Sequence, residues 1–198
     1  MKKLLLASNN RGKINEIKQL FSGIYDEVLS LKDAGIKLDV EEDGRTFEEN
    51  AIKKALAAMQ ETGMDALADD SGLEVEALGG APGIFSARFS EKGATDRSNN
   101  EKLLALLQGV PTEKRGARFT CAVALARKGR PVLTVLGHAE GIIADAPRGD
   151  GGFGYDPLFY SPGHGMTFGQ MPPEMKNAIS HRSRALKRMR ELLEQEQS

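Results

Sequence analysis

Apolar runs and helical patterns alternate at the start of the chain. Residues 2–7, KKLLLA, form a short apolar run typical of a buried strand. The segment that follows at once is polar, and an amphipathic helix comes next, with Ile14, Ile17 and Phe21 on one face. The first elements are therefore a strand, a polar loop and a helix.

The middle of the chain predicts a second helix and two short strands. The helix runs from about Thr46 to Met59, and Glu49 stands three residues after Thr46, the spacing of a capping box. DALAD, residues 65–69, predicts one short strand, and LEVEAL, residues 73–78, alternates like another. The Ser-Gly pair between them predicts a turn.

The second half of the chain adds a helix, a hairpin and a closing helix. Residues 95–110 predict the helix, and the alternating segment 116–141 reads as two strands joined by the RKGR turn. Residues 180–197 predict the last helix. The order βα, α, ββ, α, ββ, α predicts a mixed α/β or α+β fold rather than a run of βαβ repeats. We expect residues 1–198 to form a single domain.

Composition narrows the classes of partner. The chain carries 27 basic and 28 acidic residues, a net charge of -1, which gives no support to a broad nucleic-acid or membrane surface. No apolar stretch approaches the roughly 20 residues of a membrane span. The single cysteine, Cys121, excludes an internal disulfide and fits the cytoplasm, where we expect this protein.

The first polar loop is a candidate phosphate site. It joins a strand to a helix start, where free N–H groups and the helix dipole favour an anion. Lys13 lies in the first helical turn, an unfavourable place for a cation unless an anion accompanies it. An ordinary capped helix with a solvated lysine explains the pattern equally well, and both interpretations stay open.

Two acidic stretches are candidates for metal binding. Glu41 belongs to an acidic loop that is more typical of solvated charge, and Glu49 and Lys53 have the spacing of a helical ion pair. Asp69 and Asp70 close an apolar strand, and strand alternation sends neighbouring side chains to opposite faces. One of the two acids is therefore placed to bind Mg²⁺, with Glu41 as a second carboxylate. An Asx-type turn is the alternative.

The segment RGDGGFGYDPLF, residues 148–159, combines glycines with aromatics. Exposed aromatics at Phe153 and Tyr155 can stack a base, and Asp156 can accept a hydrogen bond from a base N–H. A core aromatic beside a tight turn is the commoner case. Further on, Ser180 is a candidate helix cap with His181 just inside the helix.

Five segments together resemble the inosine triphosphate pyrophosphatase family, which hydrolyses non-standard purine nucleoside triphosphates. They are ASNNRGK, EEDGRTFEENAIKKA, ADDSGLEVEALGGAPGIFSARF, GGFGYDPLF and KNAISHRSRAL, and they span nearly the whole chain in the family's order. In one departure, Asn9 stands where the family often has a glycine.

The resemblance implies a homodimer whose protomers have a long central mixed sheet flanked by helices and two lobes around a cleft. It implies Mg²⁺-dependent cleavage of a purine nucleoside triphosphate between the α and β phosphates. It places Asp70 as the catalytic acid and metal ligand, and Glu41 as the other metal ligand. The substrate-binding positions that it implies are Ser8, Asn9, Asn10, Arg11, Gly12, Lys13, Lys53, Ser71, Phe153, Gly154, Tyr155, Asp156, Lys176, His181 and Arg182.

These roles suggest a mechanism and a basis for selectivity. In our hypothesis Mg²⁺ on Glu41 and Asp70 polarises the phosphates, and Asp70 orients or deprotonates the attacking water. Hypoxanthine and xanthine present an acceptor at O6 and a donor at N1, whereas adenine reverses that pattern. A donor such as Arg182 at O6 and an acceptor such as Asp156 at N1–H would leave adenine with unpaired polar groups.

Two rival hypotheses remain. A pyrophosphatase for other modified nucleotides on a related fold is disfavoured by the GGFGYD and SHR segments. A non-catalytic nucleotide-binding module would have no need of Asp70 and Glu41, and both acids are present.

Overall fold

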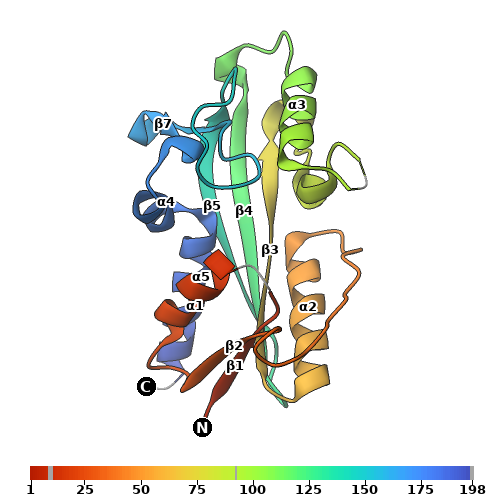
Figure 1. Cartoon of the computed structure of the whole chain (residues 1–198), viewed down its shortest axis with the longest axis vertical. Helices are drawn as coiled ribbons and strands as arrows, with labels where there is room; N and C mark the ends of the chain where they lie inside the picture. Colours follow the sequence, from red (N-terminus) through yellow and green to blue (C-terminus); the bar gives the residue numbers. More distant parts are fainter. Residues whose placement is uncertain (9–10, 92, 197–198) are drawn as a thin grey trace. The chain divides into compact units, whose positions relative to one another are not determined.

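The computed structural model describes residues 1–8, 11–91 and 93–196, and its strands form one sheet. The sheet has seven strands in the order β2-β1-β3-β4-β5-β6-β7. The main elements in chain order are β1 (Lys3–Leu6), α1 (Arg11–Phe21), β2 (Glu27–Ser30), α2 (Phe47–Thr62), β3 (Asp65–Val75), α3 (Asp96–Leu106), β4 (Gly116–Ala126), β5 (Leu133–Ile143), β6 (Phe159–Ser161), β7 (Met166–Thr167), α4 (Pro173–Ile179) and α5 (His181–Gln195) (Figure 1).

The sheet is mixed, as the sequence predicted. Strand β1 pairs in parallel with β2 on one side and with β3 on the other, where Leu6 pairs with Leu67. At the other end of the order, β5–β6 and β6–β7 are antiparallel. The predicted mixed α/β class with a long central sheet is therefore confirmed.

The contacts of the chain divide it into two compact units. The first consists of Met1–Asp70, Cys121–Gly137 and Arg184–Ser198, and the second of Ser71–Thr120 and His138–Ser183. Strands β3, β4 and β5 contribute residues to both units. The two lobes around a cleft that the resemblance implies stay a prediction, and each unit is described by itself below.

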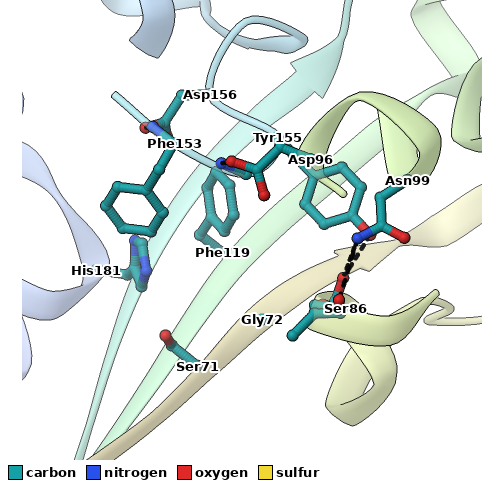
Figure 2. A pocket seen from close by; sticks show the side chains of 12 residues that line it. Ser71, Gly72, Ser86, Asp96, Asn99, Phe119, Phe153, Tyr155, Asp156 and His181 are labelled. Atoms are coloured by element: carbon teal, nitrogen blue, oxygen red, sulfur yellow. Dashed lines mark hydrogen bonds between the residues drawn. The ribbon is translucent and has the colours of Figure 1, made fainter. Parts of the chain in front are cut away.

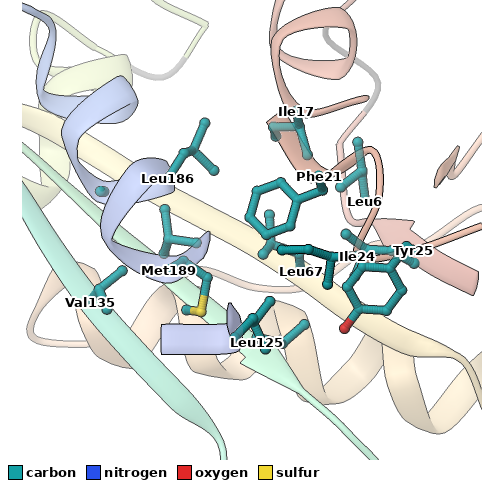
Figure 3. Close-up of a cluster of buried hydrophobic side chains, with 14 of the residues drawn as sticks. Leu6, Ile17, Phe21, Ile24, Tyr25, Leu67, Leu125, Val135, Leu186 and Met189 are labelled. Atoms are coloured by element: carbon teal, nitrogen blue, oxygen red, sulfur yellow. The ribbon is translucent and has the colours of Figure 1, made fainter. Parts of the chain in front are cut away.

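The core of the first unit follows from alternation along β1. Leu4 and Leu6 belong to one apolar cluster, with Ile17 and Phe21 of α1 and with Leu186 and Met189 of α5 (Figure 3). Leu5 belongs to a second cluster, which includes Ala58 of α2. Because neighbouring strand residues face opposite ways, α1 and α5 cover one face of the sheet and α2 covers the other (Figure 1).

The core of the second unit is built around three aromatic rings. The centroids of Phe119 and Phe159 lie 4.6 Å apart, and those of Phe159 and Phe168 lie 4.7 Å apart. Leu73 and Val75 of β3 and Leu103 of α3 pack into the same cluster. These contacts hold Phe119 of strand β4 in the core of the second unit.

The ends of α2 largely follow the sequence signals. Thr46 is the N-cap, and its hydroxyl accepts a hydrogen bond from the Glu49 N–H at 3.1 Å, as predicted. The Glu49 carboxylate accepts from the N–H of Arg45 at 2.7 Å. The helix ends at Gly63, whose φ of 70° is the left-handed conformation that favours glycine.

One expectation about the strands is wrong. Residues 65–69 and 73–78 do not form two strands separated by a Ser-Gly turn, because a single strand, β3, runs through Asp65–Val75. Its sheet neighbours are β1 and β4, and the N–H of Leu73 donates to the hydroxyl of Ser86 at 2.8 Å. Ser71 and Gly72 therefore lie inside one extended strand, and the Asx-type turn does not form.

The closing helix is amphipathic. Ala185, Leu186, Met189 and Leu193 of α5 are buried, and charged residues occupy much of the rest of its surface. Throughout residues 1–8, 11–91 and 93–196, no helix combines the length and the apolar character that crossing a membrane requires.

Candidate functional site

Asp70 lies in the middle of β3 rather than at its end. The parallel pairing of β1 with β3 stops at Leu6 and Leu67, and the N–H of Ala7 donates to the Leu67 carbonyl at 2.9 Å. Strand β3 therefore continues past the carboxyl end of β1, and Asp70 stands three residues beyond this pairing. In open α/β sheets, ligands bind outside the carboxyl ends of parallel strands.

Two groups hold the carboxylate of Asp70. Its Oδ2 accepts a hydrogen bond from Asn50 Nδ2 at 3.0 Å, and its Oδ1 lies 3.6 Å from Lys54 Nζ. Lys54 Nζ also contacts Glu42 Oε1 at 2.6 Å. We call Glu42, Asn50, Lys54 and Asp70 the carboxylate cluster. Its four members belong to the first unit.

The carboxylate cluster carries an excess of negative charge. Burial raises the pKa of the Asp70 carboxyl, and the charges of Glu42 and Asp69 add to the rise, while Lys54 and Asn50 oppose it. Burial alone would lower the pKa of Lys54, yet the charges of Asp70 and Glu42 outweigh it and the pKa is raised. Within the cluster one lysine does not balance the two acids Glu42 and Asp70, so the cluster favours the arrival of a further cation.

The donor chemistry of the cluster fits Mg²⁺. This ion prefers oxygen ligands and usually takes one or two carboxylates, with substrate phosphates and waters completing its shell. Within the described ranges, no three acidic, histidine or cysteine side chains are gathered as an all-protein metal site. Asp70 supplies one carboxylate. Glu42 is the acid that shares Lys54 with it, whereas the side chain of Glu41 is exposed, and its metal role stays a prediction.

The two neighbouring lysines of α2 have different partners. Lys53, the residue named from the sequence, pairs with the exposed Asp43 at 2.5 Å. Lys54 is the lysine that reaches Asp70, and sequence reasoning missed it. Lys54 stands four residues after the buried Asn50, and that spacing puts both on one helix face. A buried asparagine is hard to recognise from sequence, which is why the signal was overlooked.

The first loop is described only in part. Asn9 and Asn10 lie outside the described residues, and Arg11, Gly12 and Lys13 are described only as the first residues of α1. Ser8 is half-buried, and its N–H donates to the Leu6 carbonyl at 2.7 Å. The phosphate-binding role of this loop stays a prediction.

The second unit contains a pocket of about 150 Å³. This is smaller than the roughly 300–1,000 Å³ of pockets that hold a drug-sized ligand, so it suits one planar group. Figure 2 shows Phe119, Phe153 and His181 gathered on one side, and Tyr155, Asn99 and Ser86 on the other. We call it the aromatic pocket. It is lined by Ser71, Gly72, Ser86, Ala87, Asp96, Asn99, Phe119, Phe153, Gly154, Tyr155, Asp156 and His181.

Two cations face the ring of Phe153. Lys176 Nζ lies 4.5 Å from the ring centroid, and the guanidinium carbon of Arg182 lies 5.6 Å from it. Phe153 is 50% exposed, which is unusual for a large apolar side chain. An exposed aromatic face beside hydrogen-bond donors is suited to stacking and reading a base.

Asp156 is buried at the base of this arrangement. Its Oδ2 accepts from the Phe153 N–H at 2.8 Å and also contacts Lys176 Nζ. Burial raises the pKa of the Asp156 carboxyl, although Lys176, the Phe153 N–H and Arg182 lower it in part. A Cβ on Gly152 would stand 2.0 Å from that oxygen, so the loop needs glycine there. Asp156 thus organises the loop and Lys176, and its predicted contact with a base N–H remains untested.

Three predicted residues stand at the start of α5, and one of them, His181, lines this pocket. Ser180 caps the helix, because its hydroxyl accepts from the Ser183 N–H at 3.2 Å, as predicted. The ring of His181 stacks on Phe119 at 4.8 Å. Arg182 Nη2 donates to Ser71 Oγ at 3.3 Å. His181 and Arg182 are both buried.

On the far wall of the aromatic pocket, the sequence did not single out Ser86, Asp96 or Asn99. Tyr155 was expected there as an exposed aromatic, which is wrong, because it is only 4% exposed. The Tyr155 hydroxyl donates to the Ser86 carbonyl at 2.8 Å, and Asn99 Nδ2 lies 3.3 Å from the same carbonyl (Figure 2). Burial raises the pKa of Tyr155. The N–H of Gly154 donates to Asp96 at 2.7 Å, and its carbonyl accepts from Asn100 at 2.9 Å. Helix α3 thus clamps the loop that carries Phe153.

Comparison with known proteins gives consistent matches. The model of the Ham1 family matches residues 4–192. A dITP/XTP pyrophosphatase of Desulforamulus reducens is 52% identical over 96% of this chain and 95% of its own. A dITP/XTP pyrophosphatase of Geobacter sulfurreducens is 52% identical over 94% of each. The structure of the Staphylococcus aureus Ham1 protein has a TM-score of 0.91 and 42% identity, covering 98% of this chain and 100% of that one.

Proposed function

Because this chain belongs to the Ham1 family, we propose that it hydrolyses non-standard purine nucleoside triphosphates such as ITP, dITP and XTP. The products are the nucleoside monophosphate and pyrophosphate. The observation that carries this proposal is the 52% identity, over nearly the whole chain, with relatives that are named dITP/XTP pyrophosphatases. Such an activity keeps these nucleotides out of the precursor pools of DNA and RNA.

The carboxylate cluster supplies the catalytic side of the proposal. Asp70 is the catalytic acid, which orients or deprotonates the attacking water and would hold Mg²⁺ with Glu41 or Glu42. When bound, the ion supplies positive charge to the phosphates. Lys54 supplies a second positive charge, since it already lies 3.6 Å from Asp70. Water adds to the α phosphorus and gives up a proton to Asp70 or to solvent. The bond between the α phosphorus and the α–β bridging oxygen breaks, and pyrophosphate leaves with the electron pair.

The aromatic pocket supplies base recognition. Phe153 stacks on the purine. The ammonium group of Lys176 and the guanidinium group of Arg182 donate hydrogen bonds to O6 of the purine. Hypoxanthine and xanthine accept there, whereas the adenine amino group would face these donors without an acceptor. A buried mismatch of this kind is costly because the donors stay unpaired. The contacts of both cations with the Phe153 ring support this assignment.

The surroundings in which the protein works are also part of the proposal. We propose that it acts as a homodimer in the cytoplasm, as the family resemblance implies, without nucleic-acid or membrane partners. The net charge of -1 supports the absence of nucleic-acid and membrane partners, because the protein as a whole attracts these polyanions little.

A product assay tests the proposal. The purified protein is incubated with Mg²⁺ and separately with ITP, XTP, GTP and ATP, and pyrophosphate and phosphate are measured in parallel. Pyrophosphate from ITP and XTP, with little product from ATP, supports the proposal. Phosphate as the direct product would overturn the cleavage between the α and β phosphates.

A further inference from the structure

We propose that Asn50 is the positioning residue of the catalytic carboxylate, which it ties to the acidic loop before α2. This inference rests on the proposed function, since it takes Asp70 as the catalytic acid. Asn50 has no charge, does not itself react, and acts through Asp70. Neither the sequence motifs nor the family resemblance gave it a role.

Both ends of the Asn50 amide are used. Its Oδ1 accepts a hydrogen bond from the Gly44 N–H at 2.8 Å, and its Nδ2 donates to Asp70 Oδ2 at 3.0 Å. The orientation of the amide follows from its partners, because a backbone N–H can only donate and a carboxylate only accepts. One side chain therefore joins the acidic loop to β3.

The surroundings of Asn50 leave this bridge little freedom. The residue is 1% exposed, and it lies one residue after Glu49 in the capped first turn of α2. A Cβ on Gly44 would lie 2.5 Å from Asn50 Oδ1 and 2.9 Å from Glu49 Cβ. The loop backbone thus approaches the amide so closely that only glycine fits. The buried side-chain amide of Asn50, hydrogen-bonded at both ends, is therefore held in one orientation.

The bridge decides which oxygen of Asp70 is available. Oδ2 is engaged by Asn50, whereas Oδ1 faces Lys54. Without the amide, the carboxylate would be free to rotate about its terminal torsion, which has a broad profile. A catalytic group outside its productive geometry loses rate even when it remains present. Asn50 also fixes the loop that carries Glu41 and Glu42, because Gly44 follows them closely.

Two variants of nearly equal shape separate the contacts of Asn50. Asn50→Asp keeps an acceptor for Gly44 but loses the donor to Asp70, and Asn50→Leu loses both. We expect kcat for ITP to fall about 10- to 100-fold in each, the usual loss for a group that orients a metal-binding carboxylate. The KM for ITP stays close to that of the wild type, because Asn50 does not touch the substrate.

A matched control distinguishes positioning from folding. Thr46→Ala removes the cap of the same helix without touching Asp70, and we expect it to lower the melting temperature with turnover retained. Amide hydrogen exchange adds a readout independent of activity: protection of the Gly44 N–H is lost in Asn50→Leu and kept in Asn50→Asp. Asp70→Asn is measured beside them.

The outcomes are distinguishable. If Asp70→Asn turns over ITP normally, the catalytic role proposed for Asp70 is wrong, and this inference falls with it. If Asp70→Asn is inactive but both Asn50 variants retain kcat within about 3-fold, well short of the expected loss, the inference alone is overturned. It is also overturned if Thr46→Ala loses as much turnover as Asn50→Leu at the same loss of stability.

Discussion

The ammonium group of Lys176 contacts the carboxylate of Asp156, and the two side chains are only 13% and 2% exposed. The same ammonium lies 4.5 Å from the centroid of the exposed Phe153 ring. A buried acid thus holds a cation against the surface on which a base would stack. This relationship assigns Asp156 an indirect part in base recognition, through Lys176 and through the loop N–H of Phe153.

Replacement of Asp156 by asparagine tests that indirect part. Asp156→Asn keeps the shape but removes the charge that holds Lys176, so the donor and the Phe153 loop lose their fixed positions. We expect the KM for ITP to rise about 10-fold or more and the preference for ITP over ATP to narrow, as for a lost charge-assisted contact. Steady-state kinetics with both nucleotides measure this.

Asp145→Asn is the control for that variant. Asp145 lies in the same unit and pairs with Arg115 at 3.1 Å, but its side chain is 64% exposed and it does not line the aromatic pocket. We expect kinetics like those of the wild type. An unchanged KM and preference in Asp156→Asn would contradict the assignment.

The pH dependence of stability follows from the same acid. Burial raises the pKa of Asp156 in the folded protein. The folded state therefore binds a proton more tightly than the unfolded state, whose carboxyl titrates near the ordinary value of about 3.9. The stability contributed by this proton is fully present below that value and is lost as the pH rises through the raised pKa.

Denaturation by urea measures this effect. Between about pH 4 and about pH 7, the free energy of unfolding of the wild type minus that of Asp156→Asn is expected to fall as the pH rises. If this difference in the free energy of unfolding grows as the pH rises, then Lys176 lowers the pKa of Asp156 by more than burial raises it.

The neighbouring lysines of α2 give a matched pair of variants. Lys54→Met removes the cation that lies between Glu42 and Asp70, and we expect kcat/KM for ITP to fall about 100-fold or more, as for other lost catalytic charges. Lys53→Met removes an exposed pair with Asp43, and we expect it to change stability and turnover little, because solvent screens an exposed ion pair. If Lys53→Met lowers kcat/KM for ITP far more than Lys54→Met does, Lys53 is the triphosphate-binding lysine and the assignment of Lys54 is wrong.

The role of Mg²⁺ is tested through binding as well as turnover. Removal of the ion with EDTA is expected to abolish hydrolysis of ITP, and added Mg²⁺ restores it. With a non-hydrolysable ITP analogue, Mg²⁺ is expected to raise the melting temperature of the wild type, because a ligand that binds only the folded state stabilises it. Asp70→Asn is expected to lose most of this gain. If Mg²⁺ raises the melting temperature of Asp70→Asn as much as that of the wild type, Asp70 is not a ligand of the metal.

Much of the fold was predictable because its helices and long strands repeat clear patterns. The amphipathic helices α1, α2, α3 and α5 and the hairpin strands β4 and β5 were all expected. Strands β2, β6 and β7 have four, three and two residues, too few to show a period. The continuity of β3 was missed because Ser71-Gly72 is a turn signal locally, whereas the place of β3 between β1 and β4 is a tertiary feature that the local pattern does not contain.

The candidate site was likewise predictable only where local sequence patterns indicate its residues. Motifs pointed to the Asp69-Asp70 pair and to the Phe153 loop, because acids and glycine-flanked aromatics are visible in sequence. The choice of Asp70 over Asp69 came from the family resemblance. The choice of Lys54 over Lys53 depends on which face of α2 is buried, and the pairing of Asp156 with Lys176 joins residues 20 positions apart. The role of Asn50 depends on the approach of the Gly44 backbone. These are tertiary contacts, which no local pattern encodes.

Competition between nucleotides tests the central claim most directly. The wild-type protein is given equal concentrations of ITP and ATP with Mg²⁺ in one reaction, and the monophosphates and pyrophosphate are resolved over time. The account predicts that IMP and pyrophosphate appear together in equal amounts while ATP remains almost intact. Formation of AMP at the rate of IMP, or release of phosphate in place of pyrophosphate, would contradict it.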